Sequence, residues 1–260
     1  LAGRNASVPE WASTHPDPAS RVKSALTKAG TRTGQTNADV FLTRIDGMTY
    51  GDDPRQGVIE GNTFIHPDMR LTFSAPQGYY MVNGTRAVSV NGQSGKAELT
   101  LAPYNGNLET YIQSVFAELG GQQQRLAPSS MQRTTVNGIP AAYGQARVNN
   151  GNSQVDVVVF AYEFAKDRAY HFTAITQVGG AGVFTPMFNS MRKISANEAA
   201  QVVPRRIQVV TVRSSDTVAS LSRRMAYDSG QEARFRVLNG LASNDTVRTG
   251  QKVKIVVKGS

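Results

Sequence analysis

Cysteine is absent from this 260-residue sequence, and histidine occurs only three times. Without cysteine the chain has no disulfide framework, no thiolate metal site and no cysteine nucleophile. Long hydrophobic runs are also missing, because no stretch approaches the ~18 apolar residues that a membrane-spanning helix needs. The most apolar run, residues 155–162, is interrupted by Asp156. We therefore expect no transmembrane segment.

The residues that are present support folded domains. Hydrophobic residues make up 40% of the chain and charged residues 18%, so it can bury a core and is not dominated by disorder. At this length we expect two or three domains. Most of the net charge of +9 lies in residues 201–260, which hold 11 basic and 4 acidic side chains. A charge of this sign favours acidic partners such as nucleic acid or an anionic envelope surface.

Hydrophobic periodicity and turn residues predict the order of the elements. Pro18 suits the start of a helix and Gly30 its end, and a second short helix is expected at residues 37–44. Further along, alternation of apolar residues predicts strands and a 3.6-residue period predicts helices. The strands are expected at residues 70–75, 79–83, 86–90, 97–102, 141–148, 154–164 and 169–177, and the helices at residues 108–119 and 182–193.

These elements predict an α+β fold, with an antiparallel-sheet α/β/α sandwich at residues 62–200. A short helical segment, residues 1–61, precedes it. Pro204 and two arginines mark a boundary after it, and residues 205–260 are expected to form a small βααβ domain. In that domain Asp216 is placed to cap the first helix, and Asn239-Gly240 to end the second.

The small domain resembles a known module. Val-Arg-Ser-Ser-Asp-Thr-Val at residues 212–218 is followed by Leu-Asn-Gly-Leu at 238–241 and Arg-Thr-Gly-Gln-Lys-Val-Lys-Ile at 248–255. In this order the motifs resemble the LysM module, although Ser215 replaces the usual glycine. The resemblance implies binding of glycans that contain N-acetylglucosamine, such as peptidoglycan, between two loops. The residues that match those loops are Asp216, Thr217, Val218, Asn239, Gly240 and Leu241.

A purely structural interpretation of the same residues stays open. Asp216 can serve only as a helix cap, and Asn239-Gly240 only as a helix stop.

The beginning of the chain resembles a protease family. Trp-Ala-Ser-Thr-His-Pro-Asp-Pro-Ala-Ser-Arg-Val at residues 11–22, together with residues 50–67, is similar to HtpX-like zinc metallopeptidases of peptidase family M-forty-eight. The resemblance implies a periplasmic metalloendopeptidase of protein quality control, with misfolded envelope proteins as substrates. Residues 1–61 would be a helical remnant of its protease domain. His15 would be a metal ligand only in the intact protease, and in this chain we interpret it as shaping the entry to the first helix.

The zinc-binding motif of that family is missing. It requires His-Glu-x-x-His on a helix, which places two imidazoles one turn apart. Here His66 lies 51 residues after His15, and His171 lies 105 residues after His66, so both later histidines are interpreted as structural. We therefore assign no catalytic residue and no cofactor to this chain, and zinc only to the intact protease. The chain is expected to be a non-catalytic C-terminal fragment.

The middle domain is similar to PsbP-like sandwiches. The resemblance rests on Phe-x-x-Pro-x-Gly-Tyr at residues 73–79, Val-Asn-Gly-Ile-Pro-Ala at 136–141 and the helix at 184–191. Such a fold implies binding or scaffolding. Tyr79, Tyr80 and Tyr104 are candidates to line a peptide groove, although aromatic filling of a sheet face explains them equally well.

The function we predict is the non-catalytic C-terminal region of a bacterial periplasmic zinc-dependent metalloendopeptidase. It would position the enzyme at the cell envelope or on substrate proteins. Its expected partners are the upstream protease domain and peptidoglycan or envelope glycans. The alternative is a stand-alone envelope-binding protein without protease activity. Nucleic-acid binding is not expected, because only Tyr227 and Phe235 are aromatic among the terminal basic residues.

Overall fold

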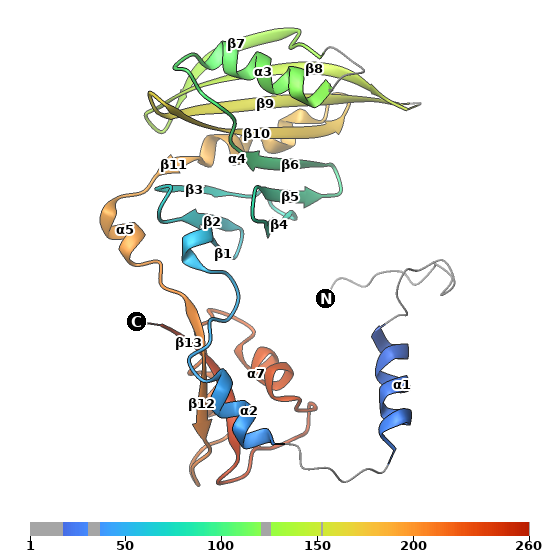
Figure 1. The fold of residues 1–260 in the computed structure, drawn as a ribbon, viewed down its shortest axis with the longest axis vertical. Coiled ribbons are helices and arrows are strands. Elements are labelled where there is room, and N and C mark those ends of the chain that lie inside the picture. Colours follow the sequence, from blue (N-terminus) through green and yellow to red (C-terminus); the bar gives the residue numbers. More distant parts are fainter. Residues whose placement is uncertain (1–17, 31–36, 121–125, 152, 260) are drawn as a thin grey trace. The chain divides into compact units, whose positions relative to one another are not determined.

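The computed structural model describes residues 18–30, 37–120, 126–151 and 153–259. The fold is mixed α+β, with a seven-stranded antiparallel sheet, a four-stranded sheet, a two-stranded sheet and several helices (Figure 1). Two compact units make up the chain, Leu1–Arg44 and Ile45–Ser260. Within the described ranges, no helix is both long and apolar enough to cross a membrane.

The first unit contains the two helices predicted from the sequence. Helix α1 (Pro18–Ala29) is followed by Gly30, whose φ of 56° is the left-handed conformation that commonly ends a helix. Helix α2 (Ala38–Ile45) follows and continues by one residue into the second unit. Val22 and Leu26 of α1 are exposed, as are the large apolar side chains near the start of α2. His15 lies outside the described residues.

The seven-stranded sheet is the centre of the second unit. Its strand order is β4-β5-β6-β10-β9-β8-β7, so β10 lies in the middle. The predicted strands in this part of the chain are confirmed, and β7 is an addition. Its sequence is mostly polar because it is an edge strand on which only Val136 is buried. The strands are β4 (Tyr80–Asn83), β5 (Val88–Gly92), β6 (Gly95–Thr100), β7 (Ser130–Val136), β8 (Ile139–Asn150), β9 (Ser153–Ala165) and β10 (Arg168–Gln177).

One face of this sheet is covered by helix α3 (Leu108–Gly120), as predicted. The helix packs on β8 and β9 and buries Tyr111, Ile112 and Phe116 against them. Because α3 lies over this half of the sheet, no helix of the described residues covers β5 and β6 on the same face.

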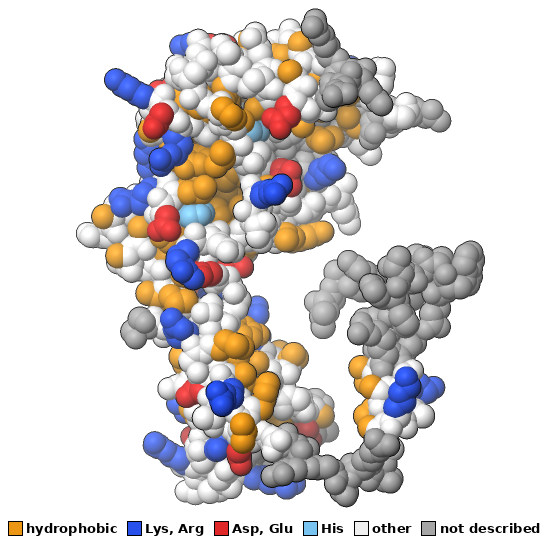
Figure 2. All heavy atoms as spheres, in the orientation of Figure 1, with side chains coloured by type: hydrophobic (Ala, Val, Ile, Leu, Met, Phe, Trp, Pro, Cys, Tyr) orange, Lys and Arg blue, Asp and Glu red, His pale blue; other side chains and the backbone are white. Residues whose placement is uncertain are grey.

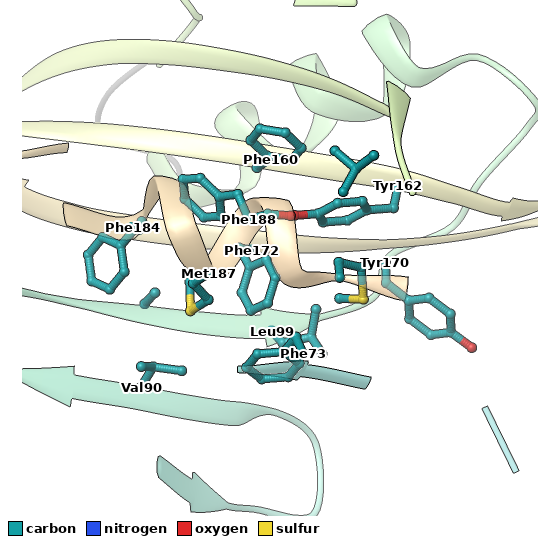
Figure 3. Close-up of a cluster of buried hydrophobic side chains, with 14 of the residues drawn as sticks. Phe73, Val90, Leu99, Phe160, Tyr162, Tyr170, Phe172, Phe184, Met187 and Phe188 are labelled. Atoms are coloured by element: carbon teal, nitrogen blue, oxygen red, sulfur yellow. The ribbon is translucent and has the colours of Figure 1, made fainter. Parts of the chain in front are cut away.

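The opposite face packs against the 3-10 helix η3 (Ala181–Phe184), helix α4 (Thr185–Ser190) and the four-stranded sheet. That sheet has the order β1-β2-β3-β11 and consists of β1 (Val58–Glu60), β2 (Thr63–His66), β3 (Leu71–Ser74) and β11 (Arg192–Lys193). Figure 3 shows the aromatic core between the layers. Its centre is Phe172, which meets Phe73 edge-on with ring centroids 4.9 Å apart and lies 5.7 Å from Phe188.

The predicted closing helix at residues 182–193 is wrong in length. Helix α4 stops at Ser190, and Met191 has an extended conformation with a ψ of 125°. The next two residues form β11, which pairs with β3 through Arg192 with Thr72 and Lys193 with Leu71. The helix is cut short because these residues satisfy the otherwise unpaired edge of β3.

The chain ends in the C-terminal region, defined here as residues 205–258, after the short helix α5 (Ala196–Ala200). It has the predicted order of strand, helix, helix and strand. Leu221, Phe235 and Ile255 are at the centre of its core. Strands β12 (Arg205–Thr211) and β13 (Lys252–Lys258) pair antiparallel, and helices α6 (Val218–Ser222) and α7 (Gln231–Asn239) lie between them in sequence.

The second edge of β12 is also hydrogen-bonded. Gly47 N donates to Ile207 O at 2.8 Å, and Ile207 N donates to Met48 O at 2.9 Å. Tyr50 N then donates to Arg205 O at 2.8 Å, and the 3-10 helix η2 (Pro54–Gln56) leads on to β1. The segment that leads to the four-stranded sheet thus runs along β12 and forms an isolated antiparallel bridge with it, between Thr49 and Arg206.

Candidate functional site

The first of the two predicted glycan-binding loops follows β12. Arg213 N donates to Asp216 Oδ2 at 2.8 Å, and Asp216 N donates back to Arg213 O at 3.0 Å, which closes a turn. The helix cap is Thr217, whose Oγ1 accepts from Ser220 N at 3.1 Å. The prediction that Asp216 caps this helix is therefore wrong, because a capping box between Thr217 and Ser220 already satisfies the first turn. Val218 is buried in the core.

The second loop begins at the end of α7. Asn239 Nδ2 donates to Phe235 O at 3.0 Å and to Lys254 O at 2.9 Å, while its Oδ1 accepts from Lys254 N at 2.7 Å. Gly240 has a φ of 65°, the left-handed conformation of a helix C-cap. Leu241 packs on the core. The side chain of Asn239 thus ties the helix to β13 and is not directed to a ligand.

The structure brings the two loops to the same end of the β12–β13 pair. Val212 N donates to Gln251 O at 2.8 Å, and Gly250 N donates to Val212 O at 2.9 Å. These bonds place the first loop directly beside residues 248–251.

A cavity of about 520 Å³ lies at the second loop. Of the six predicted glycan-binding residues, only Leu241 lines it. The other lining residues were not predicted as site residues, although a polar stretch after Leu-Asn-Gly-Leu was a signal for them. They are Asn244, Asp245, Thr246, Arg248 and Gln251.

The loop around this cavity is held by Arg236. Its Nη1 donates to Ala242 O at 2.7 Å and to Asp245 O at 3.0 Å, and its Nε donates to Glu232 Oε1 at 2.9 Å. Ala242 N donates to Asp245 Oδ2 at 2.8 Å. These bonds fix the loop before any ligand arrives, which lowers the entropic cost of binding.

Three side chains of the loop remain available. Among the residues that the structure describes, the side chains of Asn244, Thr246 and Arg248 have no hydrogen-bond partner. They offer an amide, a hydroxyl and a guanidinium, beside the apolar surface of Leu241. The cavity can therefore accept a ligand rich in hydroxyl and amide groups.

Some of the basic residues of the C-terminal region have structural roles. The guanidinium carbons of Arg205 and Arg234 lie 4.9 Å and 4.4 Å from the ring centre of Tyr227, within the range of cation–π attraction. Arg205 Nη2 also contacts Glu60 Oε1 at 3.3 Å. On the face shown in Figure 2, lysine and arginine side chains are scattered among other types and do not form one continuous stripe.

The two described histidines lie apart from these loops. His66 Nδ1 accepts from Met69 N at 3.3 Å, and partial burial lowers the pKa of its imidazole. His171 is buried on β10 and hydrogen-bonded to Tyr111. Within residues 18–30, 37–120, 126–151 and 153–259, no group of three or more histidine, aspartate or glutamate side chains is placed to hold a metal ion. The assignment of His15 as a zinc ligand stays a prediction.

The three tyrosines suggested for a peptide groove do not share a surface. Tyr79 packs edge-on against Phe184, with ring centroids 5.3 Å apart, on one side of the seven-stranded sheet. Tyr104 packs edge-on against Tyr111 on the other side. Tyr80 is 65% exposed on the edge strand β4. The prediction that the three tyrosines line one groove is therefore wrong. Tyr79 and Tyr104 instead pack as aromatic side chains on the two faces of the sheet.

Comparisons with known proteins give little further information. No protein-family profile and no curated protein matches the sequence. A crystal structure of a protein from Bacteroides thetaiotaomicron VPI-5482 is similar in part, with a TM-score of 0.40 and 11% sequence identity. The match covers 64% of this chain and 57% of that protein. At this TM-score the likeness identifies neither a fold family nor a function.

Proposed function

We propose that the C-terminal region is a LysM-like module that binds glycans containing N-acetylglucosamine, such as peptidoglycan. Residues 62–200 would be a PsbP-like α/β/α sandwich. The observation that carries the proposal is the preorganised loop beside the cavity at one end of a strand–helix–helix–strand unit. An amide, a hydroxyl and a guanidinium in one rigid loop match the hydroxyl and acetamido groups of such a sugar.

The charge of the region agrees with this ligand. Residues 201–260 carry a net charge of +7, which favours association with an anionic cell wall. The hydrogen-bonding side chains at the cavity provide specificity that a charged surface alone lacks. Nucleic acid is a poorer candidate because Tyr227, one of the two aromatics, is covered by Arg205 and Arg234 and is not a free stacking platform.

We further propose that this module positions a periplasmic HtpX-like zinc metalloendopeptidase, of which the chain is a non-catalytic C-terminal region. The protease-like motifs at residues 11–22 and 50–67 support this. So do the exposed apolar side chains of α1 and α2, because an apolar helix face normally packs on a partner. The described residues include no set that fits zinc, so no step of peptide hydrolysis is assigned to them.

Sedimentation with purified peptidoglycan tests the glycan proposal. The chain should co-sediment with the polymer, and salt should weaken this binding less steeply than it weakens nucleic-acid binding. Arg248→Ala and Asn244→Ala should each weaken binding about tenfold, the effect of ~1.4 kcal/mol.

Arg223→Ala is the matched control for charge. Arg223 is the exposed C-cap residue directly after α6, and it does not line the cavity. It should bind like the unmodified chain. Equal losses in Arg223→Ala and Arg248→Ala, or no retention on peptidoglycan, would refute the cavity as the site.

The protease attribution has its own test. The purified chain should not cleave casein when zinc is added, and coding sequence upstream of Leu1 should contain an in-frame His-Glu-x-x-His. Zinc-dependent cleavage by this chain would overturn the assignment of a non-catalytic region. An upstream sequence without the motif would favour the stand-alone envelope-binding protein.

A further inference from the structure

A second cavity, of about 340 Å³, lies on the face of the seven-stranded sheet that carries α3. It occupies the part of the face that the helix leaves open, beside β5, β6 and β10. Its sheet side includes the polar side chains of Glu98 on β6 and His171 on β10. Its helix side is formed by Val115, Glu118 and Leu119 of α3.

His171 forms the floor of this cavity and is only 3% exposed. Its Nδ1 lies 2.8 Å from Tyr111 Oη, which also accepts a hydrogen bond from Ala102 N at 3.0 Å. Burial raises the pKa of Tyr111 to about 12, so its hydroxyl keeps its proton. The alternative acceptor, Ala169 O, is 3.5 Å away. The hydroxyl therefore donates to Nδ1.

The remaining proton of the imidazole is then on Nε2. Burial lowers the pKa of His171 to about 4, so the ring is neutral at pH 7 and carries one proton. Because Nδ1 is an acceptor, Nε2–H is a donor.

This donor opens on the cavity. In the described part of the chain, Nε2 of His171 has no hydrogen-bond partner. Nε2 is not among the described side-chain atoms that are both buried and without a partner, which are Tyr79 Oη and Thr176 Oγ1. The atom is therefore accessible from the cavity. A donor at the floor of a cavity, on a side chain that is otherwise buried, requires an acceptor from whatever enters.

Carboxylates lie on two sides of this donor. Thr173 pairs with Glu98 and His171 pairs with Thr100, so Glu98 is the diagonal neighbour of His171, at ~7–8 Å between backbone positions. Glu98 Oε1 accepts from Ser89 Oγ at 3.0 Å, and its second oxygen has no partner among the described residues. Glu118 reaches the cavity from α3.

The charge balance favours a cation in the ligand. Among the described residues that line the cavity, Lys96 is the one cationic side chain, against two carboxylates. Lys96 pairs with Ile175, whereas Glu98 pairs with Thr173, two residues earlier on β10. Val115 and Leu119 form an apolar wall on the helix side.

We propose that this cavity binds the N-terminal end of a short peptide. Its ammonium group would lie on Glu98 and Glu118, its first carbonyl oxygen would accept from His171 Nε2–H, and its first side chain would pack on Val115 and Leu119. An α-amino carbonyl unit supplies a cation, an acceptor and an apolar group within a few ångströms, which is the combination this cavity offers. The proposal is independent of the glycan site, because the two share no residue.

Titration of the full chain with the tripeptide Leu-Ala-Ala, followed by two-dimensional NMR and calorimetry, tests the proposal. Backbone signals around Glu98 and His171 should shift. The N-acetylated tripeptide, which lacks the ammonium group, should bind at least tenfold more weakly. No binding of the free tripeptide, or equal binding of both peptides, would refute the site.

Variants separate the roles of the side chains. Glu98→Gln and Glu118→Gln are surface changes and should each weaken binding fivefold or more. Asp167→Asn, an exposed carboxylate outside the cavity, is the matched control and should bind like the unmodified chain. His171→Phe keeps an aromatic ring and removes the donor. In a variant whose NMR spectrum shows that it is folded, this change should weaken binding of the tripeptide. Unchanged binding in both glutamate variants would contradict the proposal.

Discussion

The sheet region, residues 58–193, and the C-terminal region hold themselves together in different ways. The sheet region buries large aromatic side chains between its layers, among them Phe73, Phe172 and Phe184. The C-terminal region has one fully buried aromatic residue, Phe235. Instead of a large aromatic core, this region has side chains that hydrogen-bond to distant backbone atoms. Asn239 bonds to Lys254, and Arg236 bonds to the loop that follows α7.

This difference follows from size. A small unit buries a smaller fraction of its surface on folding, so its core offsets less of the entropy of ordering its loops. Hydrogen bonds from Asn239 and Arg236 fix the loops of the C-terminal region without adding to the core. The consequence for function is that the same bonds that stabilise the region also shape its cavity, whereas in the sheet region the aromatic core around Phe172 and the cavity at His171 are on opposite faces of the sheet.

The largest expected effect tests the aromatic core. Phe172→Ala should destabilise the protein by about 3–5 kcal/mol, because it leaves a cavity where Phe73 and Phe188 meet. Hydrogen exchange resolved by residue should show faster exchange throughout the sheet region. Val82→Ala, which removes a half-exposed side chain on edge strand β4, should cost no more than about 0.5 kcal/mol. Comparable losses in the two variants would argue against this core.

The next effect tests the polar ties of the C-terminal region. Asn239→Ala removes three hydrogen bonds to the backbone and should cost about 2 kcal/mol. Faster exchange is expected in α7 and β13 and not in β8–β10. Asn244→Ala is the matched control, since its amide has no partner among the described residues and its loss should leave stability unchanged. If Asn239→Ala also left the stability unchanged, the hydrogen bonds of Asn239 would not be what stabilises this region.

The smallest expected effect tests whether hydrogen bonds of a buried polar side chain also stabilise the sheet region. Asp156 is 2% exposed, and its carboxylate accepts from Arg147 Nε at 3.0 Å and from Gly179 N at 2.7 Å. These bonds hold its pKa below the ordinary value. Their stabilisation is therefore present above about pH 4 and is lost as the pH falls through the lower, folded-state pKa.

Asp156→Asn should thus be about 1–2 kcal/mol less stable than the unmodified chain at pH 7, with a difference that shrinks below about pH 4. Chemical unfolding at pH 7 and pH 3 measures it. Asp167→Asn, at an exposed position, should show no difference at either pH. A gap that stays constant with pH would mean that ionisation of Asp156 does not contribute.

The sequence predicted the elements whose periodicity is strong. Helix α3 and strands β8, β9 and β10 were found because their apolar residues recur at regular spacing. Strand β7 was missed since an edge strand with one buried residue has no apolar alternation. The length of α4 was overestimated because pairing of β11 with β3 depends on residues about 120 positions away, which a local pattern does not contain.

The candidate sites were predicted less well, for related reasons. Asp216 and Asn239 were selected by motif, but their polar atoms turn inward to the backbone, and only the structure shows this. His171 was interpreted as structural, and this holds for its Nδ1, which is hydrogen-bonded to Tyr111. The sequence contains no signal for the direction of Nε2, because that depends on how far α3 extends over the sheet.

The hydrogen bond between Tyr50 and Arg205 has a consequence for the engineering of the chain. Residues 51–204 leave one strand and return to its neighbour, so the whole sheet region is an insertion between two adjacent, hydrogen-bonded positions. A two-residue turn is enough to join antiparallel neighbours. The sheet region can therefore be regarded as a cassette, removable in principle at its base, that is inserted between residue 50 and strand β12.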